Sequence, residues 1–532
     1  MPHKIDRRTL LTSSLVGGVL AARPAWANTI ATKTDNPAVE TTAWKVRGVM
    51  NNGVHVFRGV PYGASTAGAN RFMPPRRPEP WTGIRNAYEN GHTAPQIMPA
   101  ASAIGFGLRS NSLQGEDCLV LNVFTPGVGD ARKRPVMVWI HGGGYTYSSG
   151  TTLVADGTNL ARTGDVTVVC LNHRLNIFGH LYLDEVGGAK YAGSGNLGML
   201  DLVAALEWVR DNITRFGGDP GNVTIFGQSG GGGKVSTLLA MPAAKGLFHK
   251  AIVESGSTLK QQTREDAQKT TVQVFERLGL KPNQTDALQN VDALQNLPVQ
   301  KLLDAMGNAR LSPVVDGKVL PRNPFDPTAP DVSADVPVII GTAETEGTYF
   351  ATPDILVLDE ATMRARLKQR LHDDSDRVIE LFRKDRPHAN PSELYYTISA
   401  FPTKANIQAE RKAALGKAPA YLYLIDWRTP VQDGTRFSPH CLELPFVFNN
   451  VWHMPELVGA GPEIQPLANK VSGAWVAFAR TGNPNHAGIP HWPAYDAAGR
   501  ATMLINNEWK AIDDPHREER LAMLKFEDLP MT

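Results

Sequence analysis

The sequence predicts an α/β fold with a large, mostly parallel central sheet flanked by helices. Seven short apolar runs alternate with stretches of helical spacing, and they begin at residues 119, 136, 166, 223, 251, 336 and 420. Each run is almost continuously hydrophobic, which is typical of strands that helices cover on both faces. A chain of 532 residues, of which 42% are hydrophobic, is long enough to bury a core of that size.

The clearest helical segment spans residues 199–216, where apolar residues recur at steps of three and four until Gly217 and Gly218 end the pattern. Residues 352–400 are more polar and charged, with helical spacing and no strong strand. We expect them to form inserted helices that lie over the sheet edge or over a pocket. No convincing interdomain linker interrupts residues 28–532, so we expect a single domain there.

The charge balance argues against a nucleic-acid partner. Lysine and arginine total 54 against 52 acidic residues, so the chain has no global basic field. We therefore expect a small-molecule or polymer substrate.

The three cysteines, Cys118, Cys170 and Cys441, cannot all pair, so at least one thiol is free and no disulfide framework holds the fold.

The N-terminus is typical of a twin-arginine export signal. Arg7 and Arg8 precede a short apolar region, and Ala25-Trp26-Ala27 matches a small-x-small cleavage site. The apolar region is shorter than the roughly 20 residues that span a bilayer, so we expect no stable membrane anchor. The alternative is a buried N-terminal helix. The export interpretation predicts removal of residues 1–27 and a periplasmic or secreted mature chain.

One serine lies among glycines directly after an apolar run. In V-T-I-F-G-Q-S-G-G, Ser229 stands between Gly227 and Gly231, and glycine tolerates the tight approach and positive φ of a sharp strand-to-helix turn. A serine hydroxyl is a weak nucleophile, so it needs a base, a carboxylate to orient that base, and donors for the oxyanion. The alternative is a plain glycine-rich loop.

A second glycine motif supports the catalytic interpretation. The run R-P-V-M-V-W-I-H-G-G-G-Y, residues 134–145, ends a predicted strand with three glycines whose N–H groups can face a developing negative charge. H-G-G-G followed about 85 residues later by G-x-S-x-G is a specific pair of motifs. We expect His141 to shape this glycine turn rather than to move protons.

On these motifs and their order, the chain resembles the type-B carboxylesterases of the α/β-hydrolase superfamily, the branch that also holds cholinesterases and many bacterial esterases. The resemblance covers nearly all of residues 28–532. Further motifs that carry it are F-R-G-V-P-Y-G-A from Phe57, G-E-D-C-L-V-L-N-V-F-T-P from Gly115, L-N-H-R-L from Leu171, G-N-L-G-M-L-D from Gly195 and W-V-A-F-A-R-T-G-N-P-N from Trp475. It implies an α/β-hydrolase fold with helical insertions over the active site, and hydrolysis of a small-molecule carboxylic ester without metal or cofactor.

The resemblance also implies the site residues. Ser229 is the expected nucleophile, and the N–H groups of Gly143, Gly144 and Gly230 are the expected oxyanion donors. His440, in S-P-H-C-L-E-L-P-F-V-F, matches the family's histidine.

The expected acid is Glu346, which precedes a glycine as in the family, in the segment V-P-V-I-I-G-T-A-E-T-E-G, and Glu344 is the competitor. Ser255 aligns with a second-shell serine that hydrogen-bonds the acid. Two further pairs, Arg71 with Glu116 and Arg174 with Asp201, occupy positions where the family forms buried ion pairs.

Two departures from the family bear on specificity. Gln228 replaces the acidic residue that usually precedes the nucleophile, so a cationic substrate loses an attractive partner. The stretch between Ala94 and Cys118 contains no tryptophan, and Ala94 stands where animal members have the cysteine that pairs with the one at Cys118. We therefore expect neutral esters to be hydrolysed at least as well as choline esters.

Other functions stay open on the sequence alone. We do not expect Cys441, beside His440, to be the nucleophile, because the side chains of adjacent residues do not point at the same atom. The family also includes binding or adhesion proteins that lost the serine, and its hydrolases act on carbamates, polyesters, lactones or ester-bearing toxins. Specificity depends on pocket side chains supplied by loops, so the motifs do not choose among these substrates.

Overall fold

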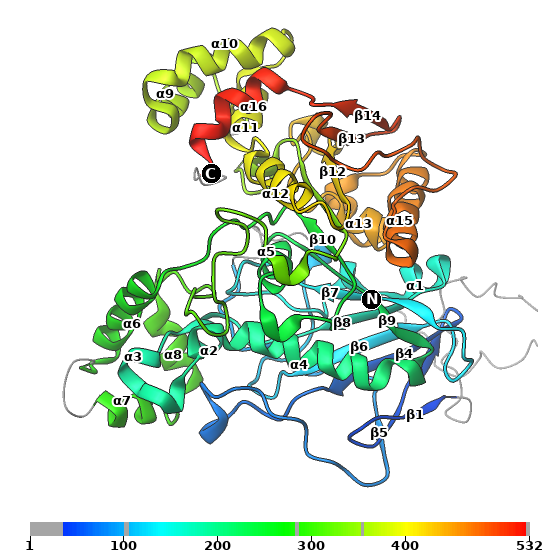
Figure 1. Cartoon of the computed structure of the whole chain (residues 1–532), viewed down its shortest axis with the longest axis vertical. Helices are drawn as coiled ribbons and strands as arrows, with labels where there is room; N and C mark the ends of the chain where they lie inside the picture. Colours follow the sequence, from blue (N-terminus) through cyan, green and yellow to red (C-terminus); the bar gives the residue numbers. More distant parts are fainter. Residues whose placement is uncertain (1–35, 100–105, 282–286, 353–355, 528–532) are drawn as a thin grey trace, which may run out of the picture.

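A computed structural model describes residues 36–99, 106–281, 287–352 and 356–527 (Figure 1). The export signal expected at residues 1–27 lies outside this part of the chain. The strands are β1 (Ala38–Glu40), β2 (Lys45–Arg47), β3 (Val49–Asn51), β4 (Val54–Pro61), β5 (Ile84–Asn86), β6 (Val120–Thr125), β7 (Arg134–Ile140), β8 (Thr167–Leu171), β9 (Gly218–Gln228), β10 (Lys250–Glu254), β11 (Val338–Ala343), β12 (Ala420–Ile425), β13 (Ala501–Ile505) and β14 (Lys510–Asp513).

One large sheet organises the molecule, in the order β14-β13-β12-β11-β10-β9-β7-β8-β6-β4-β3, and β1, β2 and β5 form a small separate sheet. The strands from β13 to β8 are parallel to their neighbours, whereas β14 at one edge and β6, β4 and β3 at the other pair antiparallel. All seven predicted runs form strands of this sheet. The predicted fold class, a mostly parallel sheet flanked by helices, is confirmed.

The helices are α1 (Thr158–Gly164), α2 (Asn176–His180), α3 (Asp184–Gly187), α4 (Leu197–Asn212), α5 (Gly230–Leu238), α6 (Arg264–Leu278), α7 (Ala287–Leu294), α8 (Val299–Met306), α9 (Glu360–Leu371), α10 (Ser375–Asp385), α11 (Pro391–Ser399), α12 (Thr403–Ala414), α13 (Leu444–Val447), α14 (Pro455–Val458), α15 (Ile464–Thr481) and α16 (Arg517–Met523). No helix in the described ranges is long and apolar enough to cross a membrane.

Helices cover both faces of the sheet, which explains why its central strands are apolar on both sides. Along β7, Val136, Val138 and Ile140 share one core with α4, α5 and part of α12. Met137 and Trp139 point to the other face, into a core shared with α1, α13 and α15. Side chains of a strand alternate between faces, so both sets are buried only because each face is covered.

The polar segment 352–400 contains α9, α10 and α11, in agreement with the helices expected there. Their apolar residues pack with α16 in a separate cluster, and Figure 1 shows α9, α10 and α16 together at the end of the molecule farthest from β1 and β5. Ser399, the last residue of α11, and its neighbour Ala400 nevertheless reach the cavity next to Ser229.

Two buried ion pairs tie this fold together. The Arg174 guanidinium donates to both carboxylate oxygens of Asp201 at 2.9 and 2.6 Å, and the two side chains are 1% and 0% exposed. Arg71 holds Glu116 in the same bidentate way at 2.7 and 2.6 Å. The three cysteines are buried and free, so no disulfide contributes to stability.

We expect Asp201→Asn to lower the free energy of unfolding by about 3–5 kcal/mol, because it leaves the Arg174 charge buried without a counter-charge. Urea unfolding followed by circular dichroism measures the loss. Lys269→Ala is the control, since Lys269 pairs with Asp266 at the surface, where an ion pair contributes about 1 kcal/mol or less. Equal effects of the two substitutions would contradict the structural role of the Arg174 pair.

Candidate active site

Ser229 occupies the sharp turn between β9, which ends at Gln228, and α5, which begins at Gly230. Its φ of 59° and ψ of −126° lie outside the favoured regions for a residue with a side chain. The Ser229 N–H is held by the carbonyl of Glu254 on the neighbouring strand at 2.8 Å. The turn therefore presents the Ser229 side chain at the end of the sheet.

The expected oxyanion donors lie in two backbone segments that touch each other. Gly143 and Gly144, in the loop after β7, have φ of 76° and 60°. A Cβ on Gly230 would lie 2.2 Å from the Gly144 carbonyl oxygen, so only glycine permits this approach. Across the described residues, the N–H groups of Gly143, Gly144 and Gly230 have no hydrogen-bond acceptor. They are free to bind a negative oxygen beside Ser229.

His440 contacts Glu346 in the buried region beside Ser229. The Nδ1 of His440 donates to Oε2 of Glu346, and the second carboxylate oxygen accepts the Ala343 N–H at 2.7 Å. Both side chains are about 1% exposed. Burial lowers the pKa of His440, but the charge and hydrogen bond of Glu346 raise it, and the net effect is a pKa above the ordinary value.

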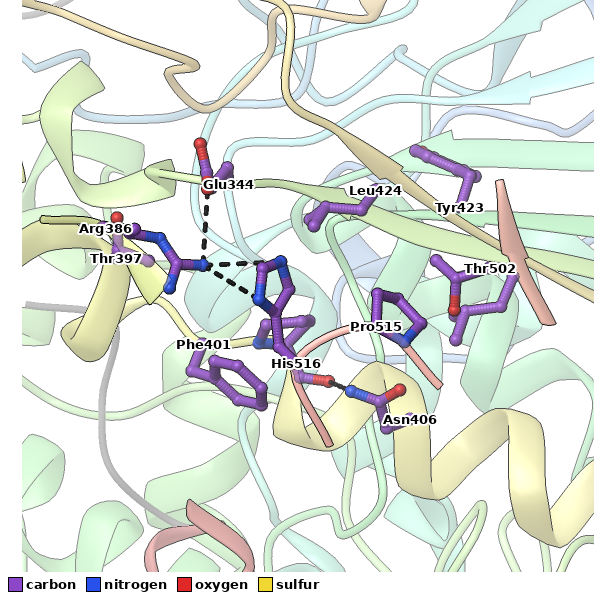
Figure 2. Close-up of a pocket in the computed structure, with 12 residues that line it drawn as sticks. Glu344, Arg386, Thr397, Phe401, Asn406, Tyr423, Leu424, Thr502, Pro515 and His516 are labelled. Atoms are coloured by element: carbon purple, nitrogen blue, oxygen red, sulfur yellow. Dashed lines mark hydrogen bonds and ion pairs between the residues drawn. The ribbon is translucent and has the colours of Figure 1, made fainter. Parts of the chain in front are cut away.

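Glu344, the competing carboxylate, points away from His440. Figure 2 shows its side chain facing Arg386, whose Nη2 lies 3.6 Å from Oε1 of Glu344, in a separate cavity of about 30 Å³. The loop after β11 is fixed by bonds between Thr345 and Ser438, in which each residue donates its N–H to the other. This pairing places Glu346 rather than Glu344 opposite His440.

Gln228 lies against the imidazole of His440. Its amide nitrogen is 3.1 Å from Nε2 and 3.3 Å from Nδ1 of the ring, and its carbonyl oxygen accepts the thiol of Cys441 at 3.3 Å. Ser229 and His440, both described, share no hydrogen bond in this resting arrangement. Burial raises the pKa of the Cys441 thiol well above its usual value, so Cys441 stays protonated and is a poor nucleophile.

The expected partner of Ser255 is corrected by the structure. The Ser255 hydroxyl donates to Oε1 of Glu443 at 3.1 Å and not to Glu346, whose two oxygens are already held by His440 and Ala343. Glu443 is fully buried, and burial together with the charge of Glu346 raises its pKa to about 7. Glu254 lies close by, and burial and Glu443 raise its pKa well above the usual value.

Sequence reasoning missed Lys234, a fully buried lysine in the first turns of α5. Its ammonium donates to the His141 carbonyl at 2.9 Å, and desolvation lowers the pKa of Lys234 to about 7. His141 stacks on His173, and burial lowers the pKa of both imidazoles, so they stay neutral. This agrees with the structural role expected for His141. The burial of Lys234 could not be predicted, because no local pattern shows that a lysine in a glycine run is buried.

Two cavities meet at Ser229. The smaller, about 50 Å³, is lined by Gly143, Gln228 and His440 together with the aromatic side chains of Trp139, Tyr147, Tyr349 and Phe350. The larger, about 320 Å³, extends on the Gly230 side between α5 and the segment that joins α11 to α12. A small molecule bound at Ser229 can therefore place one end in each of two cavities that differ in size and lining.

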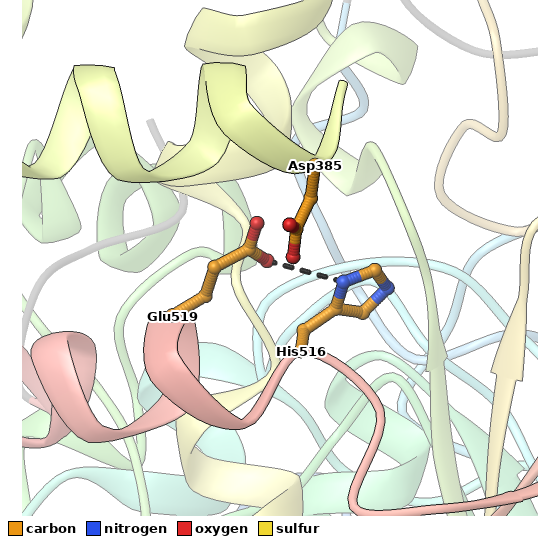
Figure 3. A group of neighbouring side chains, drawn as sticks. All are labelled: Asp385, His516 and Glu519. Carbon is orange, nitrogen blue, oxygen red and sulfur yellow. Dashed lines mark ion pairs between the residues drawn. The ribbon is translucent and has the colours of Figure 1, made fainter. Parts of the chain in front are cut away.

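One group of metal-type ligands occurs within the described ranges, away from Ser229. Figure 3 shows Asp385, His516 and Glu519, whose ligand atoms lie within 4.8 Å of one another. The Arg386 guanidinium donates to Glu519 at 2.5 Å and lies 3.4 Å from both ring nitrogens of His516. This cation already balances the Glu519 charge, so we assign no metal to the group.

A model of the carboxylesterase family matches residues 35–524. The chain belongs to this family. The family assigned from the motifs is thus confirmed, and membership makes this chain a carboxylic ester hydrolase.

The carboxylesterase relatives are similar over almost their whole length. Para-nitrobenzyl esterase of Bacillus subtilis (strain 168) is 37% identical, over 91% of this chain and 97% of its own. Phenmedipham hydrolase of Pseudarthrobacter oxydans is 32% identical, over 89% and 95%. Among solved structures, an esterase from anaerobic Clostridium hathewayi described as hydrolysing aliphatic aromatic polyesters has a TM-score of 0.80 at 33% identity, over 93% and 98%.

Substitution of Glu346 and of Glu344 tests which of the two carboxylates orients His440. We expect Glu346→Gln to lower kcat strongly, up to about 10⁴-fold, because an amide favours the wrong tautomer of His440. Glu344→Gln, the matched control, should change kcat by less than about tenfold, since its partner is Arg386. Steady-state kinetics on a chromogenic ester measures both. A larger loss in Glu344→Gln would reverse the assignment.

Gln228→Glu should move the acid limb of kcat/KM to higher pH. The amide of Gln228 donates toward the ring and favours neutral imidazole, whereas a carboxylate there would stabilise the imidazolium and raise the pKa of His440 by about one unit. The base must be neutral, so a higher pKa removes activity at a higher pH. Gln300→Glu, on the exposed side of α8, is the control. An unmoved limb in Gln228→Glu would refute this contact.

Proposed function

We propose that this chain is a serine carboxylesterase that cleaves carboxylic esters through an acyl-enzyme on Ser229. The observation that carries the proposal is the buried contact between His440 and Glu346 beside a serine held on a strained turn. The N–H groups of Gly143, Gly144 and Gly230, which have no acceptor in the part of the chain that the structure describes, support it because ester cleavage needs donors for the oxyanion. A protein that only binds a ligand does not need this combination of features.

In the first half of the reaction, Ser229 attacks the ester carbonyl and His440 takes the hydroxyl proton on Nε2. This requires a small movement of the ring from Gln228 toward Ser229, which is common because catalytic hydrogen bonds are often long in unliganded enzymes. Glu346 keeps the proton on Nδ1 and stabilises the imidazolium. The N–H groups of Gly143, Gly144 and Gly230 hold the tetrahedral oxyanion, and His440 then protonates the leaving alcohol.

In the second half, water replaces the alcohol. His440 takes a proton from water, the hydroxide attacks the acyl-enzyme, and collapse of the second tetrahedral intermediate releases the acid and restores Ser229. These residues carry every proton transfer, so we propose that no metal or organic cofactor takes part.

The lining of the smaller cavity favours a substrate whose alcohol part is neutral. Gln228 contributes no charge there, and the aromatic rings of Trp139, Tyr349 and Phe350 provide an apolar wall. Negative charge does lie behind it, since Glu346 and Glu443 are buried near His440. We propose that neutral alcohols, aryl or benzyl in shape, are accepted at least as well as cationic ones.

We also propose export of the mature enzyme through the twin-arginine signal of residues 1–27. The motif Arg7-Arg8 supports it, and the arginines should be required. N-terminal sequencing of periplasmic protein should begin at Asn28, and Arg7 and Arg8 changed together to lysine should leave precursor in the cytoplasm. An exported protein that still begins at Met1 would contradict the proposal.

Covalent labelling tests the nucleophile. An organophosphonate should add once, at Ser229, and Ser229→Ala should lose the label and turnover while keeping its melting temperature. Intact-mass and peptide mass spectrometry locate the label. Ser255→Ala is the matched control, because Ser255 lies nearby but its hydroxyl is bonded to Glu443, and it should still be labelled at Ser229. Turnover that survives in Ser229→Ala would exclude the mechanism.

A further inference from the structure

The two cavities at Ser229 divide the substrate into its alcohol and acyl parts. His440 lines the smaller cavity, whereas the residues that line the larger one include Ser229 and Gly230 but not His440. The proton for the leaving alcohol comes from His440, so the alcohol belongs in the smaller cavity. The acyl chain then extends into the larger cavity. This division rests on the function proposed above.

One wall of the acyl cavity is the N-terminus of α12. The helix has no side-chain cap and no acidic residue in its first turn. The N–H groups of Lys404 and Ala405 find no acceptor among the residues that the structure describes. A helix N-terminus carries partial positive charge, so this wall favours a negative group.

Lys404 adds a full positive charge to the same wall. It lines the cavity, is half-buried, and forms no ion pair with any carboxylate in the described ranges. The acidic residues of the lining are already engaged, since Glu346 holds His440 and Glu527 pairs with Lys260 at 3.1 Å. Among the described lining residues, Lys404 is therefore the one charged group without a counter-charge.

A buried hydroxyl next to this wall also lacks a partner. Ser399, at the end of α11, is 8% exposed and lines the cavity, and its Oγ makes no hydrogen bond with any residue that the structure describes. Ser257 and Thr342 also line the cavity, and their hydroxyls likewise have no hydrogen-bond partner within the described ranges. Buried polar groups are normally hydrogen-bonded, so these three point to a ligand with oxygen acceptors.

Another part of the cavity lining is apolar. Phe401, Met523 and Phe526 contribute side chains that suit methylene groups. A chain that is apolar along its length and anionic at its end matches this distribution better than a simple alkyl chain, which would leave Lys404 and the three hydroxyls without partners.

We propose that the larger cavity is a subsite for an acyl chain that ends in a carboxylate, so that half-esters of dicarboxylic acids are preferred substrates. The carboxylate is bound by Lys404, Ser399 and the N-terminus of α12. It takes no part in the chemistry: the bond between the acyl carbon and the alcohol oxygen breaks, water supplies the new oxygen, and the products are the alcohol and the dicarboxylic acid.

Two esters of equal acyl length test the subsite, mono(4-nitrobenzyl) adipate and 4-nitrobenzyl hexanoate, with released 4-nitrobenzyl alcohol measured by chromatography. The wild-type enzyme should show a higher kcat/KM for the adipate ester. Lys404→Gln should lower the ratio of the two kcat/KM values by about tenfold, mainly through KM, and leave the hexanoate within about twofold. Added salt should lower the wild-type ratio, because it screens the charge pair.

Lys525→Gln is the matched control, because Lys525 is a nearby surface lysine that pairs with Asp374 and does not line the cavity. It should leave the ratio unchanged, and Ser399→Ala should lower it in the same direction as Lys404→Gln. An unchanged ratio in Lys404→Gln, or a wild-type preference for hexanoate, would overturn the subsite. If Ser229→Ala still hydrolyses both esters, the proposed function itself is overturned. The two failures are therefore distinguishable.

Discussion

The arrangement of the site depends on the strained turn at Ser229, which the neighbouring strands hold in place. β9 is paired on both sides, with β7 and β10, and the Ser229 N–H bonds to the carbonyl of Glu254. A conformation of this kind costs about 1–3 kcal/mol, and it persists because the sheet on both sides restrains it. The same restraint brings Gly230 against Gly144 and so joins the two segments whose N–H groups have no acceptor among the described residues.

Buried charge is the second constraint on this site. Glu346, Glu443 and Glu254 lie together behind His440, and burial and mutual repulsion raise the pKa of Glu443 and Glu254. A further carboxylate at position 228 would add to this repulsion. Gln228 instead contributes an amide that contacts His440 without adding charge. The hydrogen bonds from Ser255 to Glu443 and from Trp475 to Glu254 satisfy part of this cluster.

Most of the fold was predictable, because buried strands carry their own pattern. The seven apolar runs became strands, and the helix expected at residues 199–216 forms as α4 followed by a short 3₁₀ turn at Ile213–Phe216. The pattern did not mark β14, whose residues are all exposed, the short strands β1, β2, β3 and β5, or the mostly buried strands β4 and β13. Strands at sheet edges bury little surface, so pairing with a neighbouring strand, rather than local hydrophobicity, determines whether they form.

The sequence by itself determined the family, the strand-to-helix turn at Ser229 and the glycine segment after β7, because each depends on residues adjacent in the chain. Only the tertiary structure decided that Glu346 rather than Glu344 faces His440, that Ser255 bonds Glu443, and that Lys404 lines a cavity beside Ser229. These contacts join segments up to 188 residues apart. Their partners are selected by how loops after different strands pack together, and no local pattern of residues encodes that packing.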